Sequence, residues 1–391
     1  MGFQALLVRE DYYSILKKTL QRYYNQRFGE GIEVGYEPKE GAAELLMNPR
    51  LGMIFEPYPP CVMRNYIYRS YDIRGNMVKN LAAKAFVFVS THTRSLFTTP
   101  KKLYIYPSSM VKKETMIAYL NRSIRIFDFK EGTTVSIQKD SFTSKFFQNQ
   151  LQYRIKNKYD FIPPITAYGD DWFEERILEG KSLARETDSA KYKEGAKTSL
   201  SKIIALAKAT TELKNTKEYV EKTTNTCNSL LSKAKDAKGI ITFDRSITYL
   251  KRLSAVLSDA PSTVQLADSH GDLQAGNVWL EKEKAWIIDW ETYDKRSIWF
   301  DTTTLLFGTR YYGGVKKLVE SIEDSTLKQT LLQGQHCDWN ARQMVALFLL
   351  EDLLFYLEDM MELPEQGGKD SFDNYMNELT EIDWNQVFSK K

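Results

Sequence analysis

Residues 269–291 read SHGDLQAGNVWLEKEKAWIIDWE, and this stretch carries two groups of polar residues separated by a short apolar run. Residues 286–288 are bulky and apolar, which predicts a buried strand that ends at Asp289. A carboxylate at a strand end is rigidly held, as a metal ligand must be. Asp272, Asn277 and Asp289 together supply the groups of a phosphoryl-transfer site. One carboxylate orients and deprotonates a hydroxyl, while an amide and a second carboxylate hold Mg²⁺.

The segments HGDLQAGN (270–277) and IIDWE (287–291) resemble the core of the aminoglycoside phosphotransferase and choline kinase family, relatives of the protein kinases. HGDxxxxN resembles the kinase catalytic loop, and IDW resembles the metal-binding DFG element. The resemblance implies that Asp272 is the catalytic base, that Asn277 and Asp289 bind Mg²⁺, and that His270 supports the loop. The alternative is a plain hairpin, with residues 272–277 as its turn and Asp289 as a capping residue.

The length and composition indicate a globular protein of two or three domains. The chain has 391 residues, of which 42% are hydrophobic, and a formal net charge of +3. Its three cysteines show no CxxC spacing, which favours reduced thiols. The N-terminus lacks the pattern of a signal peptide, and no apolar run has the length of a membrane-spanning helix. We therefore expect a soluble, cytoplasmic protein.

Residues 1–110 are predicted to form a separate α+β accessory domain. Residues 1–30 have a helical pattern, residues 31–60 have short strands and turns, and residues 61–107 have the β-propensity of a small sheet. Its second half is basic, with Asp72 as the only acid among Arg64, Arg69, Arg74, Lys79, Lys84, Arg94, Lys101, Lys102, Lys112 and Lys113. This charge makes an anionic partner a candidate. Nucleic acid is a weaker alternative, because no binding motif accompanies the charge.

Residues 111–179 are predicted to form a kinase-like small lobe. Strands at 123–129 and 133–139, a helix at 141–158 and a strand at 165–168 resemble the family in order. Lys139 lies at the end of the second strand, where the resemblance places a phosphate-binding lysine; the alternative is an exposed strand-end lysine. The helix offers only Gln150 as its partner in place of the usual glutamate, and no Gly-rich loop precedes the strands.

The segment Phe173–Leu178 is predicted to be the hinge that holds adenine through its backbone. The candidate nucleotide contacts there are Arg176, Ile177 and Leu178. By the same resemblance they form the end of the small lobe, and Gly180 permits the turn into the next lobe.

Residues 180–391 are predicted to form a large, mainly helical lobe. Asp301 starts an apolar helix, where it either steadies the catalytic loop or caps the helix. Residues 341–363 have the pattern of an amphipathic helix whose acids include Glu351 and Asp352. These acids are a solvated face or, together with Glu291, an anionic wall for a cationic substrate.

The sequence therefore predicts a bilobal, protein-kinase-like α+β fold with an N-terminal accessory domain. The implied function is transfer of the γ-phosphate of ATP or GTP, with Mg²⁺, to a hydroxyl of a sugar, amino sugar or related small metabolite or glycan. The alternative is a pseudokinase that binds a nucleotide or partner with little turnover, which the missing Gly-rich loop and Gln150 support.

Overall fold

The computed structural model describes residues 10–29, 31–93, 97–140, 142, 145–363, 368–382 and 384. The chain divides into two compact units. Unit 1 comprises residues 1–195 and 279–288, and unit 2 comprises residues 196–278 and 289–391. The beginning of the helix predicted for residues 1–30, Arg94 of the basic run, and the beginning of the helix predicted for 141–158 lie outside the described residues.

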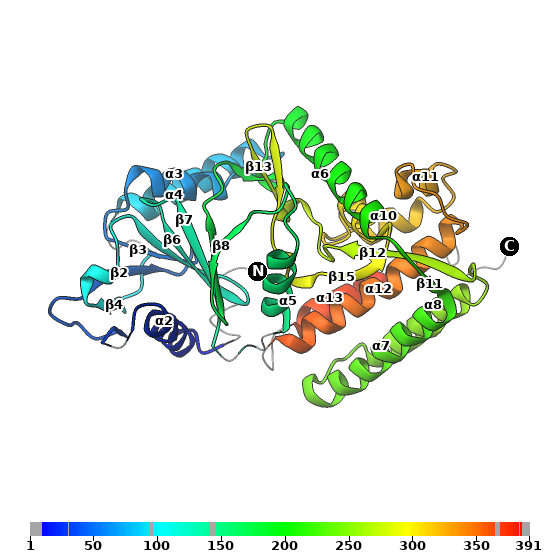
Figure 1. Ribbon diagram of the computed structural model, residues 1–391, viewed down its shortest axis with the longest axis horizontal. Helices are drawn as coiled ribbons and strands as arrows, with labels where there is room; N and C mark the ends of the chain where they lie inside the picture. The colour runs from blue at the N-terminus through cyan, green and yellow to red at the C-terminus, as the bar shows by residue number, and fades with distance from the viewer. Residues whose placement is uncertain are drawn as a thin grey trace. The chain divides into compact units, whose positions relative to one another are not determined.

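Unit 1 is built on a nine-stranded sheet with the order β1-β4-β2-β3-β5-β6-β7-β9-β8, in which neighbours are antiparallel (Figure 1). The strands are β1 (Glu33–Gly35), β2 (Ala43–Asn48), β3 (Met53–Phe55), β4 (Leu103–Tyr106), β5 (Thr115–Tyr119), β6 (Ser123–Asp128), β7 (Thr133–Gln138), β8 (Ile165–Tyr168) and β9 (Trp172–Arg176). A further small sheet joins β10 (Lys181–Ser182), β13 (Val278–Glu281) and β14 (Lys284–Ile287).

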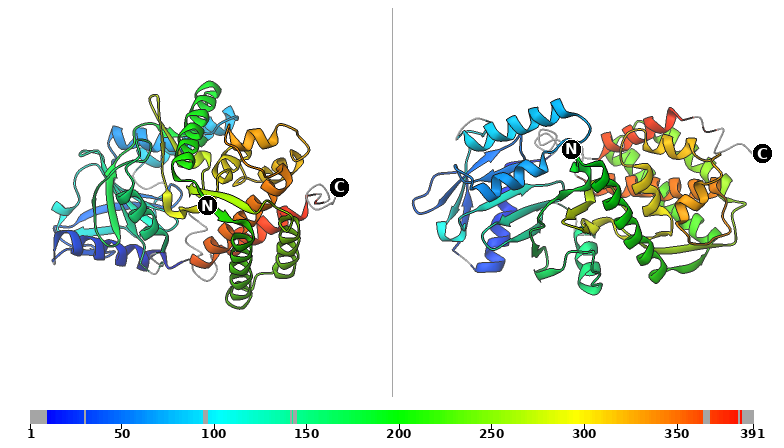
Figure 2. Two further views of the ribbon diagram at one scale, coloured as in Figure 1. Left: turned by 45° about the vertical axis from the view of Figure 1, so that its right-hand side comes forward. Right: turned by 90° about the horizontal axis from the view of Figure 1, so that it is seen from above.

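Helices cover both faces of the nine-stranded sheet. Side chains alternate between the two faces along each strand, and apolar residues occur on both, so each face packs against helices. The helix α2 (Tyr12–Phe28) packs on one face, where Ile117 and Ile124 lie. The helices α3 (Cys61–Ser70) and α4 (Met77–His92) lie over the other face, where Met116 and Phe127 lie. Figures 1 and 2 show α2 on the opposite side of the sheet from α3 and α4. The helix α5 (Lys145–Lys156) packs on the α3 side of the sheet, against Phe173.

Two predictions for the first 110 residues are wrong. Residues 61–92 form helices and not strands, although residues 103–106 form a strand as expected. Local capping outweighs the β-propensity of these residues: Pro60 precedes α3, and the side chain of Asn76 accepts a hydrogen bond from the backbone of Lys79 at the start of α4. The boundary predicted at residue 110 is also absent, because β1–β4 belong to the same sheet as β5–β9. The separate accessory domain is therefore replaced by one compact unit.

Unit 2 consists mainly of helices around a three-stranded sheet. The helices are α6 (Ser189–Thr210), whose first turns belong to unit 1, α7 (Thr216–Lys238), α8 (Phe243–Leu257), α9 (Phe300–Phe307), α10 (Gly314–Glu320), α11 (Leu327–Leu332), α12 (Ala341–Glu362) and α13 (Lys369–Thr380). The sheet has the order β11 (Glu212–Asn215), β12 (Thr263–Ser269) and β15 (Asp294–Ser297). Among the described residues, no helix is long and apolar enough to cross a bilayer.

The helix α12 forms the centre of unit 2. Residues 344–353 are all buried, and α7, α8 and α13 pack against the helix. A capping box between Asn340 and Gln343 fixes its first turn. The helix was predicted to be amphipathic, but its middle is buried on every side. It therefore contributes polar side chains to the interior of the unit, as described below.

Candidate active site

The HGD turn follows β12 and is held by Asp301 from the first turn of α9. The two carboxylate oxygens of Asp301 accept hydrogen bonds from the backbone N–H groups of His270, at 2.7 Å, and Gly271, at 3.0 Å. Both donors and the acceptor are buried. Gly271 has φ +82°, and a Cβ atom there would collide with the backbone of Thr292 and the side chain of Arg296. The turn therefore requires both the glycine and the buried carboxylate.

The carboxylate of Asp272 accepts hydrogen bonds from three side chains. Its Oδ1 accepts from Nε of Arg310 at 2.8 Å, and its Oδ2 accepts from the amides of Gln274 at 2.9 Å and Asn277 at 3.1 Å. Asn277 also donates to the backbone carbonyl of Asp272 at 2.8 Å. The side chain of Asp272 keeps 19% of its surface exposed. It is thus fixed in orientation and still accessible to solvent.

Arg310 joins this turn to the buried centre of unit 2. Besides Asp272, its guanidinium contacts the carbonyl of Gly271 at 3.0 Å and the carboxylate of Asp352 on α12. Its flat face lies 3.9 Å from the ring of Phe355. Burial opposes its positive charge, but Asp352 and Asp272 together raise the pKa of Arg310. Sequence reasoning missed this residue, since no motif includes it, and it is brought to the site only by the loop after α9.

Asp289 is held beside the HGD turn by the residues that follow it. Its backbone is left-handed, with φ 69° and ψ 55°, a conformation that non-glycine residues adopt mainly where function or packing demands it. The ring of Trp290 meets the ring of His270 edge-on, with centroids 4.8 Å apart. The hydroxyl of Thr292 donates to the carbonyl of His270 at 3.0 Å. Tertiary packing therefore brings together the two polar motifs that are separate in sequence.

Asn277 and Asp289 have the donor chemistry that a magnesium ion requires. Mg²⁺ takes oxygen ligands and is usually bound through one or two carboxylates plus phosphate oxygens of a substrate. The amide nitrogen of Asn277 donates to Asp272, so the amide oxygen is the atom that could ligate a metal ion. No group of three or more His, Cys, Asp or Glu side chains suited to a metal occurs in the described part of the chain. Asn277 and Asp289 thus supply two oxygen ligands, a number that suits an ion whose other ligands are phosphate oxygens and water.

Two of the acids predicted for an anionic wall, Glu351 and Asp352, lie in the interior. Glu351 is 2% exposed and accepts hydrogen bonds from the backbone and hydroxyl of Ser297 and from the hydroxyl of Tyr219. Burial raises the pKa of Glu351 to about 7. Asp352 is fully buried against Arg310, and Glu291 is half-buried in a short turn. Glu351 and Asp352 are thus part of the interior of unit 2 and cannot line a solvent-facing wall.

Lys139 does not occupy the position of a phosphate-binding lysine. Its ammonium lies 2.7 Å from the carboxylate of Glu10 and 3.0 Å from the carbonyl of Asn121, and its side chain has no exposed area. The nitrogen also lies 3.6 Å from the centre of the Tyr119 ring. Glu10 belongs to residues 1–110, which were predicted to form a separate domain, whereas Asn121 and Tyr119 belong to the segment predicted to form the small lobe. Gln150 is buried on α5.

An ion pair nevertheless joins α5 to the sheet, with the positive charge on the helix and the negative charge on the strand. The helix supplies Arg154 and β9 supplies Glu175, and both side chains are almost entirely buried. The guanidinium of Arg154 also donates to the carbonyl of Pro163 and lies 4.9 Å from the ring of Phe173. The sequence had excluded a pair between Lys139 and an acid of this helix, and the pair that does form has the arginine on the helix and the glutamate on the strand.

The predicted hinge residues are engaged within unit 1. The backbone N–H of Ile177 donates to the carbonyl of Gly132 at 2.8 Å. Arg176 forms a two-pronged pair with Glu281, which lowers the pKa of Glu281 to about 2. Leu178 is half-buried.

A cluster of aromatic rings packs beside this hinge. Ile177 packs against the apolar cluster that contains Tyr66 of α3 and Phe127. Tyr66 also stacks with Trp279, with ring centroids 6.3 Å apart. An adenine ring held at Phe173–Leu178 would therefore lie next to this aromatic cluster.

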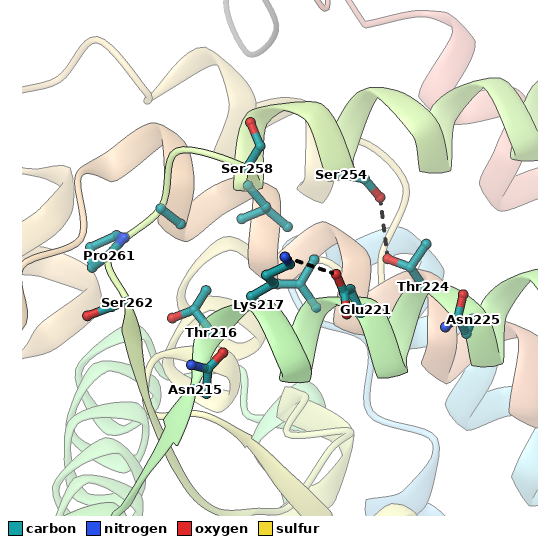
Figure 3. A pocket seen from close by; sticks show the side chains of 13 residues that line it. Asn215, Thr216, Lys217, Glu221, Thr224, Asn225, Ser254, Ser258, Pro261 and Ser262 are labelled. Carbon is teal, nitrogen blue, oxygen red and sulfur yellow. Dashed lines mark hydrogen bonds and ion pairs between the residues drawn. The ribbon is translucent and has the colours of Figure 1, made fainter.

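A pocket of about 620 Å³ opens at the start of α7 and the end of α8 (Figure 3). Its lining is rich in hydroxyl and amide groups: Asn215, Thr216, Thr224, Asn225, Ser254, Ser258 and Ser262. Because Asn215 pairs with Thr263, the pocket lies at the first residue of β12. The HGD turn follows the last residue of this strand, about 20 Å away for seven extended residues. None of the predicted site residues, all of which are described, lines this pocket.

Comparisons with solved structures match this chain to small-molecule kinases. An aminoglycoside phosphotransferase, APH(4)-Ia, in a ternary complex with ADP and hygromycin B, is 12% identical with a TM-score of 0.48, covering 71% of this chain and 95% of that one. A choline/ethanolamine kinase family protein from Mesorhizobium loti is 14% identical with a TM-score of 0.46, covering 70% and 90%. A Plasmodium vivax ethanolamine kinase is 13% identical with a TM-score of 0.44, covering 81% and 92%. No family model and no curated protein sequence matches the chain.

Proposed function

We propose that this protein is a phosphotransferase that moves the γ-phosphate of ATP or GTP to a hydroxyl of a small molecule, with Mg²⁺. The observation that carries the proposal is the geometry of Asp272. Its carboxylate accepts hydrogen bonds from Arg310, Gln274 and Asn277 and still keeps part of its surface exposed. A carboxylate fixed in this way is suited to orient an acceptor hydroxyl and to take its proton.

The other two residues of the motifs would act on the nucleotide. Asn277 and Asp289 would hold Mg²⁺ through oxygen atoms, and the ion would neutralise charge on the phosphates. Asp301 would act only through the backbone, because its two oxygens are occupied by the N–H groups of His270 and Gly271. The proposal therefore separates one residue that contacts the acceptor, two that contact the metal, and one that holds the turn.

The acceptor class that we propose is a sugar, an amino sugar or a related small metabolite. The experiment is turnover of ATP and of GTP against a mixed panel of sugars, amino sugars and amino alcohols, with phosphorylated products identified by mass spectrometry. A product whose formation requires Mg²⁺ and Asp272 would support the proposal. Binding of nucleotide without any product across the panel would favour the second candidate.

The second candidate is a nucleotide- or partner-binding protein with little turnover. Two observations favour it: Lys139 is buried against Glu10, and Tyr66 packs against the same apolar cluster as Ile177, which lies in the segment proposed to hold adenine. If the aromatic cluster restricts the nucleotide, Tyr66→Ala should tighten nucleotide binding without creating transfer. Isothermal titration of wild type and Tyr66→Ala with Mg-ATP, together with product formation measured on both proteins across the acceptor panel, separates the candidates. Tyr66 is not among the side chains that donate hydrogen bonds to Asp272, which are Arg310, Gln274 and Asn277. The variant therefore keeps the hydrogen bonds of the proposed base.

A further inference from the structure

The outer face of α4 carries an unusual set of exposed apolar side chains. Met77 is 87% exposed, Val78 is 79% exposed, Leu81 is 71% exposed and Phe88 is 53% exposed. Single exposed apolar residues are common on soluble proteins, but these four lie on one helix of 16 residues. The stripe from Met77 to Phe88 is about 16 Å long at the rise of an α-helix.

The inward face of the same helix mixes apolar and polar side chains. Phe86 and Val87 pack in the apolar cluster on the sheet. Ser90 is 2% exposed and Thr91 is 3% exposed, and the side chain of Asn80 accepts a hydrogen bond from the backbone of Ile73. Val87 is the only described bulky apolar residue of α4 that is fully buried. A helix that packs only on its own domain normally carries polar and charged residues on its outer face. The arrangement in α4 therefore favours contact between its apolar face and a surface outside the chain.

The exposed apolar residues form one continuous arc. At about 100° per residue, residues 77, 78, 81, 82, 85 and 88 fall within an arc of about 140°. The half-buried Val89 and the exposed His92, whose ring stacks on Phe88, lie in the same arc near the end of the helix. Ala82 and Ala85, which complete the arc, are also exposed. Lys79 and Lys84 lie on opposite flanks of the arc and are exposed as well. An apolar arc flanked by lysines is the pattern of a helix that lies flat in a membrane interface.

The charge around α4 is positive. Residues 61–92 contain five basic residues and one acid, Asp72. That acid is already paired with Lys84 and Lys181. Protein partners usually present charges of both signs around an apolar contact, whereas the headgroups of an anionic bilayer surround an inserted helix with one sign of charge. The charge pattern therefore favours lipid over protein as the occupant.

We propose that α4 docks this protein onto the surface of an anionic lipid bilayer. Met77, Leu81 and Phe88 enter the boundary between headgroups and acyl chains, and Lys79 contacts the lipid phosphates. The helix lies along the surface and does not span the bilayer. This proposal rests on unit 1 alone and does not depend on the phosphotransferase activity.

The test is co-sedimentation of the full chain with vesicles of phosphatidylcholine alone and of phosphatidylcholine mixed with phosphatidylglycerol. We expect binding to the mixed vesicles that is weakened by salt. Met77→Ser/Leu81→Ser should lower the affinity more than tenfold. Lys79→Glu should lower it more than about fivefold, since one lysine near an anionic surface contributes about that factor. Hydrogen exchange of the α4 backbone should slow when mixed vesicles are added.

Matched controls come from unit 2. Leu213 and Ile241 are 66% and 78% exposed, so Leu213→Ser/Ile241→Ser removes a comparable apolar surface and should leave vesicle binding unchanged. Lys208→Glu is the control for charge, because Lys208 is an exposed residue of α6. Equal binding of wild type and Met77→Ser/Leu81→Ser would overturn the proposal. A dimer of the wild type that dissociates in this variant, without vesicle binding, would overturn it in favour of a second copy of the chain as the occupant.

Discussion

The Nε atom of Arg310 lies 2.8 Å from Oδ1 of Asp272, and the same guanidinium donates to the fully buried carboxylate of Asp352. One cation thus neutralises two carboxylates, of which one is proposed to be catalytic and the other belongs to the centre of unit 2. The side chain of Arg310 is 5% exposed. Removal of Arg310 would leave Asp352 charged and buried without this partner, a state that costs much more than the loss of a surface pair.

Arg310→Gln is expected to lower the free energy of unfolding by about 3 to 5 kcal/mol, the range for breaking a buried ion pair from one side. Arg310→Lys should lower the free energy of unfolding by less, because lysine keeps the positive charge. It should still be less stable than wild type, because one ammonium group cannot reach three acceptors at once. Urea unfolding monitored by circular dichroism measures both. The double variant Arg310→Gln/Asp352→Asn should lose less than the sum of the single variants. Simple additivity would contradict a direct coupling between the two side chains.

Asp272→Asn is expected to reduce turnover by about 10²- to 10⁴-fold, the contribution of a general base. The structure adds that this variant is not conservative, because both carboxylate oxygens accept hydrogen bonds and an amide nitrogen would face a donor in either orientation. Unfolding must therefore be measured beside turnover. A folded variant with near-normal turnover would exclude Asp272 as the base.

Asp301→Asn is expected to destabilise the HGD turn by about 2 to 4 kcal/mol, because its amide nitrogen would face one of two backbone donors. The loss should appear in the free energy of unfolding even in the absence of nucleotide. Turnover should fall together with it, since Gly271 and Asp272 would no longer be held. An unchanged unfolding curve would mean that Asp301 only caps α9.

Glu351 should make stability depend on pH between about 4.5 and 7. Burial raises its pKa from 4.5 to about 7 in the folded protein. The protonated carboxyl group therefore contributes its full share to the free energy of unfolding below pH 4.5, the pKa in the unfolded chain. This contribution is lost as pH rises through 7, the pKa in the folded protein. The whole difference corresponds to about 3 kcal/mol, at about 1.4 kcal/mol for each unit. Urea unfolding of the wild type at a series of pH values from 4.5 to 8 measures the total dependence.

Glu351→Gln isolates the contribution of this carboxyl group. A glutamine oxygen can accept from Tyr219 and the backbone of Ser297, and its nitrogen can donate to the Ser297 hydroxyl. The variant should be more stable than wild type at pH 8 and should show a flatter dependence on pH. Glu283→Gln, on an exposed turn, is the control and should follow the wild type. Parallel curves for wild type and Glu351→Gln would show that burial does not perturb this group.

Asp289→Asn is expected to weaken binding of Mg-nucleotide more than Asn277→Ala, because it removes a negative charge next to the ion. Asparagine is preferable to alanine at position 289, since the left-handed backbone there tolerates Asn and Asp better than Ala. Thermal stabilisation by Mg-ATP, compared with ATP in the presence of a chelator, measures the effect. If Mg-ATP stabilised Asp289→Asn as fully as it stabilises wild type, Asp289 would not be a ligand of the metal.

Local sequence was sufficient where short-range patterns decide the structure. The strands at 123–128, 133–138 and 165–168, the helix at 145–156 and the long helix at 341–362 all follow from periodicity, turn residues and caps. The aromatic and β-branched residues at 61–92 misled the prediction, because helix caps and packing on the sheet outweighed their β-propensity.

The sequence alone determined the polar motifs around Asp272 and Asp289, because spacing along the chain defines them. It also determined the order of the strands and helices around these motifs. Tertiary structure decided the partners of these groups. Lys139 faces Glu10, Arg310 reaches Asp272, and Glu351 and Asp352 lie in the interior, each through contacts between segments distant in sequence. The free energy of a charge depends on what surrounds it in space, and no pattern of neighbours along the chain specifies that environment.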